Sequence, residues 1–329
     1  MTFWRGKKVL VTGATGLVGS WLVKELIKQE SEISCLIWDL DSNSELISSG
    51  DIQNLNVITG DLADIEACEK SISQSSCEYI FHLGAQTIVG EAISDPIRTF
   101  QSNIQGTWNI LDSVKKSRKD IKSVVVASSD KAYGVSQDLP YKETYPLHGD
   151  GPYDVSKSCT DLIAQSYANT FDLPITIARC GNIYGGGDLN WSRIVPGTIK
   201  SLLLEETPTL RSNGTFVRDY IHVSDIVDAY LHLAEQTEKK SLAGEAFNFS
   251  RNEPLTVLDI YGEICKIVVG TFIEPKILSL TSSEIVDQFL DSSKAHIDLA
   301  WKSNVKLEQG LEMTWKWYEK YFDKLAKLK

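Results

Sequence analysis

The stretch of sequence that decides the fold is Lys8-Val9-Leu10-Val11-Thr12-Gly13-Ala14-Thr15-Gly16-Leu17-Val18-Gly19. It begins with a short apolar run, which is typical of a buried parallel strand, and helical spacing of apolar residues follows from Leu17 to Gln29. Glycines between a strand and a helix let the backbone come close to a pyrophosphate, and the helix N-terminus directs amide groups and a positive dipole at it. A tight turn without a ligand is the alternative. The sequence predicts that a dinucleotide contacts Gly13, Thr15, Gly16, Leu17, Val18 and Gly19.

The alternation of strands and helices continues along the chain. Further strands are expected at 33–38, 57–59, 79–82, 123–127 and 175–179, and further helices at 65–73, 96–116 and 153–171. This rhythm predicts an α/β fold, namely a Rossmann-type doubly wound parallel sheet. Beyond about Gly181 the rhythm weakens, with a helix expected at 194–204 and a strand-like run at 216–223. We therefore expect residues 1–180 to form the dinucleotide-binding domain and residues 181–329 a smaller C-terminal substrate-binding lobe, with some late segments returning to the first lobe.

The composition of the chain limits its partners. The 329 residues are 42% hydrophobic and 23% charged, as in an ordinary soluble globular protein. The formal net charge of -11 argues against broad binding to nucleic acid or to an anionic membrane, because both need a basic face. No apolar run reaches the roughly 18 residues that a membrane-spanning helix needs, and the N-terminal residues lack the pattern of a secretion signal. We expect a cytoplasmic protein that binds neither nucleic acid nor membrane.

The six cysteines do not have the spacing of a metal site or of a redox pair. They stand at positions 35, 68, 77, 159, 180 and 265, without a Cys-x-x-Cys pair and without a histidine at zinc-ligand spacing. Most lie in apolar runs, so we expect reduced, buried cysteines and no metal.

Asp39 lies twenty residues after Gly19, where the second strand is expected to end. A carboxylate at that place accepts hydrogen bonds from both hydroxyls of an adenosine ribose and repels a 2′-phosphate. Trp38 occupies the preceding position, where an arginine would bind that phosphate, so the sequence predicts NAD rather than NADP. A solvated turn carboxylate is the alternative for Asp39. The other predicted cofactor contacts, for which simple turns are the alternative, follow the third and fourth strands and are Asp61, Leu62, Leu83, Gly84 and Ala85.

Tyr153-Asp154-Val155-Ser156-Lys157 opens a long predicted helix. A tyrosine and a lysine four residues apart on a helix lie on one face. A lysine ammonium beside a phenol favours the phenolate, so we expect the pKa of Tyr153 to lie below its usual value of about 10. The pair then provides a side-chain base that is usable near neutral pH. Ser128-Ser129 at the end of an apolar strand strengthens this interpretation, because Tyr-x-x-x-Lys alone is common.

These motifs together resemble the extended short-chain dehydrogenase/reductase family that acts on nucleotide-activated sugars. The resemblance covers nearly the whole chain and continues through Arg218-Asp219-Tyr220-Ile221-His222 and Asp291-Ser292-Ser293-Lys294-Ala295. It implies that Ser129, Tyr153 and Lys157 form a catalytic triad. In that triad Ser129 hydrogen-bonds the sugar oxygen, and Lys157 and Tyr153 also contact the cofactor.

Asp130 and Lys131 directly follow Ser129. In the family that the chain resembles, 4-epimerases usually carry small or neutral residues here, whereas sugar 4,6-dehydratases carry an acid–base pair. The resemblance therefore implies a nucleotide-sugar 4,6-dehydratase of the CDP-glucose or GDP-mannose type, with Asp130 as the acid and Lys131 as a base or proton relay. The run Val217-Arg218-Asp219-Tyr220 instead follows the general epimerase/dehydratase pattern, so the nucleotide base stays open.

Three alternatives to this interpretation remain. The chain could be an NAD-dependent epimerase that uses the same triad, or an NAD-binding sensor without catalysis. Asp130-Lys131 could also be an exposed ion pair that takes no part in chemistry.

The predicted substrate is a nucleotide-diphosphate sugar, and its predicted contacts are Gln86, Asn182, Arg193, Arg211 and Arg218. Arg218 suits a diphosphate because a planar guanidinium can donate paired hydrogen bonds. A surface charge is the alternative for Arg193 and Arg211. We expect His82 to be a structural histidine and Asn103 to hydrogen-bond backbone near the active site.

The two long predicted helices indicate a homodimer. Both carry more apolar residues than one sheet face can cover, and these are Ile104, Trp108, Ile110, Leu111, Leu162, Ile163 and Tyr167. Paired across a two-fold axis, the helices would form a four-helix bundle, which is also the usual interface of the family that the chain resembles.

Overall fold

The computed structural model describes residues 2–117, 120–239, 241–278 and 285–327. In these residues seven parallel strands form the central sheet, in the order β11-β6-β5-β4-β1-β2-β3. The strands are β1 (Lys8–Thr12), β2 (Glu32–Ile37), β3 (Asn56–Thr59), β4 (Tyr79–His82), β5 (Ser123–Ala127), β6 (Ile175–Cys180) and β11 (Ala246–Phe249). From β1 the chain runs to one edge of the sheet through β2 and β3 and then crosses to β4 on the other side of β1. Ligands of open parallel sheets bind at such a reversal, which here lies at the carboxyl ends of β1 and β4, and this place is called the crevice below.

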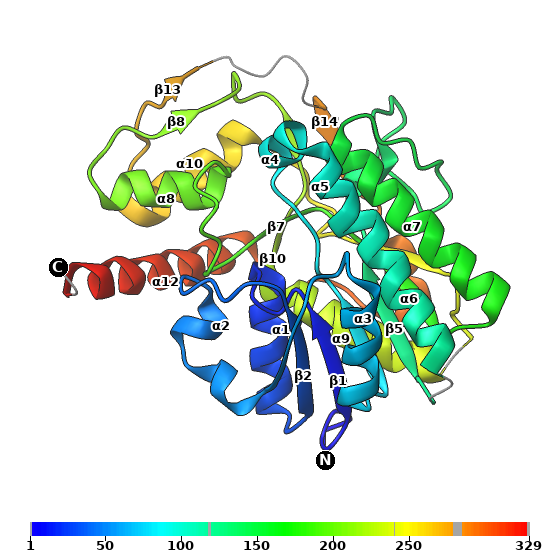
Figure 1. Ribbon diagram of the computed structural model, residues 1–329. Helices are drawn as coiled ribbons and strands as arrows, with labels where there is room; N and C mark the ends of the chain where they lie inside the picture. The colour runs from blue at the N-terminus through cyan, green and yellow to red at the C-terminus, as the bar shows by residue number, and fades with distance from the viewer. Residues whose placement is uncertain (1, 118–119, 240, 279–284, 328–329) are drawn as a thin grey trace.

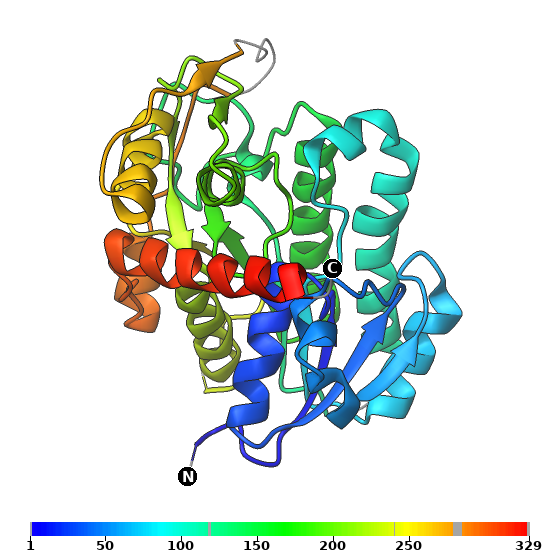
Figure 2. The same ribbon diagram turned by 90° about the vertical axis from the view of Figure 1, so that its left-hand side faces the viewer.

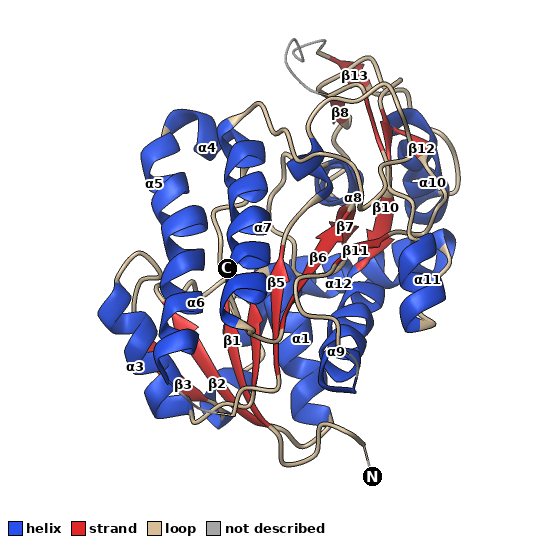
Figure 3. Cartoon of the chain, turned by 90° about the vertical axis from the view of Figure 1, so that its right-hand side faces the viewer, coloured by secondary structure: helices blue, strands red, loops and turns tan. Residues whose placement is uncertain are grey.

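Helices cover both faces of the sheet (Figures 1 and 3). One face carries α3 (Ile65–Ser75), α6 (Gly106–Ser117) and α7 (Pro152–Phe171), with α4 (Val89–Ser94) and α5 (Pro96–Phe100) beyond them, and the other carries α1 (Leu17–Lys28), α2 (Glu45–Ser48), α9 (Val223–Lys239) and α11 (Ser293–Leu299). Side chains alternate between the faces as in any strand. Val9 and Val11 pack into the core beneath α1 and α9, whereas Leu10 packs into the core beneath α6 and α7.

The C-terminal lobe has its own hydrophobic core, built on Tyr184, Ile199, Tyr261 and Tyr318. Its elements are β7 (Asn182–Tyr184), α8 (Ile194–Leu203), β8 (Thr209–Leu210), β9 (Val217–Arg218), β10 (Tyr220–His222), β12 (Leu255–Thr256), α10 (Val257–Val269), β13 (Lys276–Ile277), β14 (Asp287–Gln288) and α12 (Leu307–Lys327). Figure 2 shows α12 running between α8 and α10 on one side and α1 on the other. The lobe therefore rests on the sheet domain along α12.

The predicted fold class is confirmed, and three local predictions differ from the structure. The helix expected at 96–116 is divided into α5, a π-helical turn at Gln101–Gln105 and α6. The run at 216–223 forms two short strands, and its last residue, Val223, begins α9. Strand β11 was not expected and becomes the seventh strand at the β6 edge. Helix α9 and strand β11 come from the later part of the chain but pack with the sheet domain. The domain border at residue 180 therefore stays a prediction.

Two further observations concern the whole chain. The six cysteines are reduced, as predicted, and five of them are buried, whereas Cys159 is partly exposed. None of the helices in the described part of the chain combines the length and the apolar character needed to cross a membrane.

Candidate active site

The glycine turn lies at the carboxyl ends of β1 and β4. Gly13 has a φ of +71°, and a Cβ on it would come 2.7 Å from the backbone nitrogen of Gly84. A Cβ on Gly19 would come 2.1 Å from the carbonyl oxygen of Gly13. Only glycine fits at both positions, because backbone atoms stand where a side chain would begin. The turn therefore keeps the strand ends and the start of α1 closely packed.

The start of α1 suits an anionic group. Its N-cap is Gly16, which supplies no side-chain hydrogen bond to the helix. The amides of the first turn, from Leu17 and Val18 onward, are thus left without a side-chain acceptor at the positive end of the helix dipole. Together with the close-packed glycines, this arrangement fits the pyrophosphate of a dinucleotide.

Three of the other predicted cofactor residues, Asp39, Asp61 and Leu62, follow the ends of β2 and β3. Leu62 packs on Gly84, where its Cδ1 stands 2.5 Å from the position of a Cβ on the glycine. Asp39 is exposed just beyond the end of β2. Asp61 pairs with Arg98 at 2.8 Å, and the guanidinium of Arg98 stacks 4.6 Å above the ring centre of Trp38. The carboxylate of Asp61 therefore already has a cationic partner from α5.

His82 is a structural residue, as predicted. Its Nδ1 lies 2.9 Å from Thr12 Oγ1, and its Nε2 lies 3.2 Å from Thr107 Oγ1. Burial, with a contribution from the nearby charge of Lys157, lowers the pKa of His82 to about 3, so the ring is neutral. The histidine joins β1, β4 and α6 beneath the crevice, and Thr12 Oγ1 also accepts the amide of Gly84 at 3.0 Å.

Asn103 lies in the π-helical turn between α5 and α6 and is buried. Its Oδ1 accepts the amide of Gln86 at 2.7 Å, and its Nδ2 donates to the Gln86 carbonyl at 2.9 Å and to Ser156 Oγ at 2.8 Å. The expected bond to backbone is confirmed. A π-helical turn often marks a functional site, and this one ties the loop after β4 to the helix that carries Tyr153 and Lys157.

Tyr153 and Lys157 lie one turn apart on α7, but the expected effect of the lysine on the phenol is wrong in this structure. Burial raises the pKa of Tyr153 to about 12, and a hydrogen bond with Ser129 and the charge of Arg193 oppose the shift only in part. Lys157 Nζ donates instead to the Ala127 carbonyl at 2.8 Å, and burial lowers the pKa of this lysine to about 8. The phenol is therefore neutral as the structure stands.

Ser129 and Asp130 begin the short 3-10 helix Asp130–Tyr133, with Ser129 as its N-cap. Ser129 Oγ donates to Asp130 Oδ1 at 2.9 Å and accepts the amide of Lys131 at 3.2 Å. Asp130 is only 3% exposed, and within the described residues its Oδ2 has no hydrogen-bond partner. Burial raises the pKa of Asp130, although Lys131, Ser129 and Arg218 act in the opposite direction. A buried carboxyl with a raised pKa suits a proton donor, so Asp130 is not part of an exposed ion pair.

Lys131 points toward the C-terminal lobe. Its Nζ donates to Gln288 Oε1 of strand β14 at 2.8 Å. No signal in the sequence marks Gln288, because it lies 157 residues away in a two-residue strand without a recognisable pattern. The contact joins the turn after β5 to the lobe that is expected to bind the substrate.

The predicted substrate residues divide into two groups. Arg218 is 8% exposed and donates through Nη1 to the carbonyls of Val217 and Val286, at 2.8 and 2.7 Å, and through Nη2 to the carbonyl of Ile285. Its positive charge also opposes in part the rise that burial causes in the pKa of Asp130. Arg193 pairs with Asp188 at 2.9 Å, and its positive charge opposes the rise in the pKa of Tyr153. Both arginines are thus close to the predicted catalytic side chains.

The other three predicted substrate contacts are Gln86, Asn182 and Arg211. Gln86 Oε1 accepts the amide of Ile88 at 2.8 Å, so one end of this side chain serves its own loop. Asn182 begins β7, where its amide donates to the Asp219 carbonyl at 2.8 Å. Arg211 is exposed directly after β8. Their roles toward a substrate stay predictions.

A buried ion pair supports the far end of the 3-10 helix. Arg179 of β6 binds Asp161 of α7 through two bonds, with Nε to Oδ2 at 2.7 Å and Nη2 to Oδ1 at 2.9 Å. Its Nη1 donates to the hydroxyl of Tyr133 at 2.8 Å and to the Glu143 carbonyl at 3.1 Å. Tyr133 ends the helix that Asp130 begins, so this pair fixes the turn from below.

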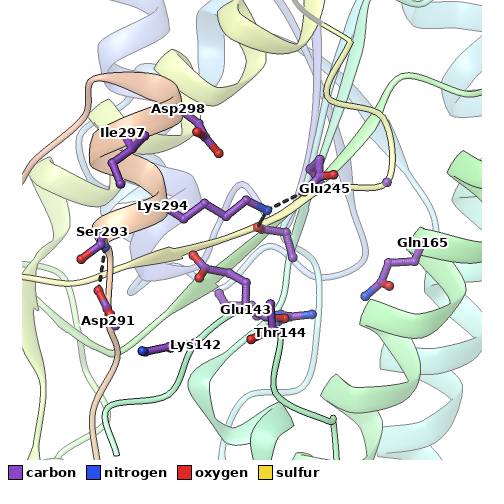
Figure 4. Close-up of a pocket in the computed structure, with 13 residues that line it drawn as sticks. Lys142, Glu143, Thr144, Gln165, Glu245, Asp291, Ser293, Lys294, Ile297 and Asp298 are labelled. Atoms are coloured by element: carbon purple, nitrogen blue, oxygen red, sulfur yellow. Dashed lines mark hydrogen bonds and ion pairs between the residues drawn. The ribbon is translucent and has the colours of Figure 1, made fainter.

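A cavity of about 580 Å³ lies elsewhere, at the β11 edge of the sheet (Figure 4). Residues of mixed charge line it, including Glu143, Gln165, Glu245 and Lys294, and Lys294 already donates to the Ala246 carbonyl at 2.9 Å. Its lining contains none of the predicted catalytic residues. The predicted catalytic residues lie instead directly after β5 (Ser123–Ala127) and at the start of α7 (Pro152–Phe171).

Several known proteins resemble this chain in sequence and in fold. The sequence profile of the NAD dependent epimerase/dehydratase family matches residues 9–249. CDP-glucose 4,6-dehydratase from Salmonella typhimurium is 30% identical over an alignment of 346 positions. The alignment covers 96% of this chain and 92% of that protein. The structure of dTDP-glucose 4,6-dehydratase from Bacillus anthracis in complex with NAD superposes with a TM-score of 0.85 at 26% identity, covering 98% of this chain and 100% of that one. UDP-glucose 4-epimerase from Thermotoga maritima with UDP-glucose gives a TM-score of 0.83 at 28% identity, covering 95% of this chain and 99% of that one.

Proposed function

Since the chain belongs to the NAD dependent epimerase/dehydratase family, we propose that it is a nucleotide-sugar 4,6-dehydratase. The proposed reaction oxidises carbon 4 of the sugar, eliminates water across carbons 5 and 6 and returns the hydride to carbon 6. The product is a 4-keto-6-deoxy sugar that is still attached to its nucleotide. NAD is regenerated in each turnover and is not consumed.

The observation that carries this proposal is the buried acid beside the triad. Asp130 is 3% exposed, bonds to Ser129 and has a raised pKa through burial. An epimerase needs no proton donor for a departing hydroxyl, whereas an elimination does. The likeness to CDP-glucose 4,6-dehydratase points in the same direction.

NAD fits the crevice that the glycine turn borders. The start of α1 would hold its pyrophosphate, Asp39 would hold its adenosine ribose, and Lys157 would hold its nicotinamide ribose. When bound, NAD supplies the site that accepts and later returns a hydride.

The chain's own residues move the protons of the first step. Tyr153 is proposed to take the proton of the sugar 4-hydroxyl through its phenolic oxygen, and Ser129 to hydrogen-bond the same sugar oxygen. The pKa of about 12 for Tyr153 means that its phenolate must be stabilised when the site is filled. Lys157, one turn away, is the cation placed to do so once it leaves the Ala127 carbonyl.

The elimination needs an acid and a base. The ketone at carbon 4 makes the hydrogen on carbon 5 acidic. A base, for which Lys131 is the candidate or the relay, removes that proton, and the electron pair forms the bond between carbons 5 and 6. To act as the base, Lys131 must be in its neutral amine form. Asp130 gives its proton to the oxygen on carbon 6, which leaves as water. When the hydride adds to carbon 6, carbon 5 takes a proton, and Lys131, which holds the proton removed earlier, is the candidate to return it. Burial keeps Asp130 protonated to higher pH than an exposed carboxyl and so suits it to this step.

Two arginines support a nucleotide-diphosphate sugar as the substrate. Arg218 and Arg193 both act electrostatically on the catalytic side chains, so their positive charge lies beside the reacting end of the crevice. Nη1 of Arg218 donates to the carbonyls of Val217 and Val286, and Nη2 donates to the carbonyl of Ile285. Arg218 is therefore proposed to bind the diphosphate with Nε–H and the second N–H of Nη2.

A panel of substrates tests the proposed function. The NAD-loaded protein is incubated separately with CDP-glucose, GDP-mannose, dTDP-glucose and UDP-sugars, and the products are analysed by mass spectrometry. We expect one sugar to lose the mass of a water molecule. A change of stereochemistry without a change of mass would indicate an epimerase instead, and NAD binding without any turnover would indicate a sensor.

We also propose that the protein is a homodimer. Trp108 on α6 and Leu162 on α7 are 42% and 53% exposed, and Ile97 on α5 is 70% exposed. Ile110 and Leu111, which the sequence placed in this interface, are instead buried in the core of the protomer. The remaining apolar face on α5, α6 and α7 fits a four-helix bundle between two copies. Light scattering at micromolar concentration should give twice the mass of one chain, and a monomeric mass would refute the dimer.

A further inference from the structure

Gln288 combines three features that the proposed chemistry has not used. Its side chain is fully buried on strand β14. Its Oε1 accepts Lys131 Nζ at 2.8 Å. Its Nε2 has no hydrogen-bond partner among the described residues. A lysine ammonium can only donate, so the amide oxygen must face Lys131 and the amide N–H groups must face away from it.

The strand that carries Gln288 also reaches the other groups of the site. Gln288 pairs in register with Arg218 of β9, and the carbonyl of Val286 accepts Arg218 Nη1 at 2.7 Å. The amide of Leu290 donates to Asp219 Oδ2, and the carbonyl of Tyr141, which follows the Asp130 turn, accepts the amide of Asp291 at 2.9 Å. This strand is therefore held on several sides and can fix a side chain against Lys131.

Unpartnered buried polar atoms gather around the same turn. They are Ser128 Oγ, Asp130 Oδ2, Asp219 Oδ1 and Gln288 Nε2, none of which has a hydrogen-bond partner within the described ranges. Buried polar groups are nearly always hydrogen-bonded to protein, water or ligand. Gln288 Nε2 offers donors and Asp130 Oδ2 an acceptor, and a hydroxyl group both donates and accepts. Such a set suits a hydroxyl-bearing ligand such as a sugar.

We propose that Gln288 is a positioning residue for Lys131, which it holds through its amide oxygen while its N–H groups face the sugar hydroxyls of the substrate. This inference rests on the proposed function for the role of Lys131. It adds a residue from the C-terminal lobe to the elimination, so the lobe contributes to the chemistry as well as to binding.

The contact itself can be tested without any substrate. The free protein is labelled with trace acetic anhydride, and the rate of acylation of Lys131 is measured by peptide mass spectrometry. Loss of one hydrogen bond should make Lys131 about two- to tenfold more reactive in Gln288→Leu. Gln288→Glu keeps an oxygen for the ammonium and should not increase the rate. An unchanged rate in Gln288→Leu overturns the proposal, whatever reaction the protein catalyses.

The role in turnover is tested with a double-mutant cycle. Gln288→Leu should lower the rate of water loss about tenfold or more, because Lys131 is no longer held, while oxidation of carbon 4 in a single turnover continues. In the Lys131→Ala background the same change should have no further effect. Effects that multiply in the double variant would overturn the positioning role.

In Gln288→Glu the KM for the nucleotide sugar should rise about tenfold, because the N–H donors are lost. An unchanged KM would refute their contact with the sugar.

Two controls separate these effects from general damage to the strand. Asp287→Ala alters the exposed neighbour on β14, whose side chain points to the opposite side, and should leave both readouts unchanged. If Gln288→Leu does not fold, Gln288→Asn replaces it, since its amide is one methylene too short to reach Lys131 and the same increase in labelling is expected. A substrate panel without water loss would contradict the proposed function, whereas the labelling result would still decide whether Gln288 holds Lys131.

Discussion

Replacing Arg179 by methionine should strongly destabilise the protein. The side chains of Arg179 and Asp161 are 2% and 0% exposed and form a two-bond ion pair between β6 and α7. In Arg179→Met the buried carboxylate of Asp161 keeps, among the described residues, the side-chain amide of Gln165 at 2.7 Å as its hydrogen-bond partner. Breaking a buried pair by removing one partner costs about 3–5 kcal/mol. The free energy of unfolding is only about 5–15 kcal/mol for a typical domain, so this loss is a large fraction of it.

Urea denaturation followed by circular dichroism measures this effect. Arg5→Met is the matched control, because Arg5 pairs with Glu30 at 2.8 Å with both side chains more than half exposed. That pair should contribute about 1 kcal/mol or less. The double variant Arg179→Met/Asp161→Leu should be more stable than Arg179→Met alone, since no buried charge is left unpaired. A loss below about 1 kcal/mol in Arg179→Met, or a double variant less stable than the single one, would refute this reasoning.

Three further predictions concern the site. Tyr153→Phe should lower the rate of oxidation of carbon 4, followed as reduced-cofactor absorbance, by about a hundredfold or more. Oxidation at the native rate would exclude Tyr153 as the base. Gly13→Ala should weaken NAD binding in calorimetry at least about tenfold, because its Cβ would meet Gly84 N at 2.7 Å; a native affinity would show that this turn does not hold the cofactor. Burial raises the pKa of Asp219 from 3.8 to about 6. Its contribution to stability is complete below about pH 4 and decreases by about 3 kcal/mol as the pH rises through about 6. Asp219→Asn should remove this slope from urea titrations between about pH 4 and 7, and an unchanged slope would contradict the assignment.

The sequence predicted the sheet domain well because its signals are local. A buried parallel strand is a short apolar run, and the glycine turn shows where the first strand ends and α1 begins. The observed β1 (Lys8–Thr12), β4 (Tyr79–His82) and β5 (Ser123–Ala127) coincide with the predicted strands. Asn103 and His82 also behave as expected, since each satisfies neighbouring groups within the crevice.

What the sequence could not predict depends on contacts between distant segments. Strand β11 is only four residues long and joins the sheet after the C-terminal lobe has begun. The π-helical turn in the helix after Pro96 follows from the tertiary bonds of Asn103 to Gln86 and Ser156, which no helix propensity reports. The pKa of Tyr153 was predicted from its spacing to Lys157, but burial has the larger effect. Gln288 shows the same limit, since only folding brings it to Lys131.

The central claim is that Asp130 acts as the acid that makes this protein a dehydratase. The most direct test follows a single turnover of Asp130→Asn with the nucleotide sugar that the native protein uses, recording reduced-cofactor absorbance and loss of water by mass spectrometry in the same sample. The triad and the cofactor turn are intact in this variant, so carbon 4 should still be oxidised. Water loss should fall by about a hundredfold or more, the usual contribution of one general acid. Water loss at the native rate would contradict the account, because the buried carboxyl beside Ser129 would then have no part in the reaction.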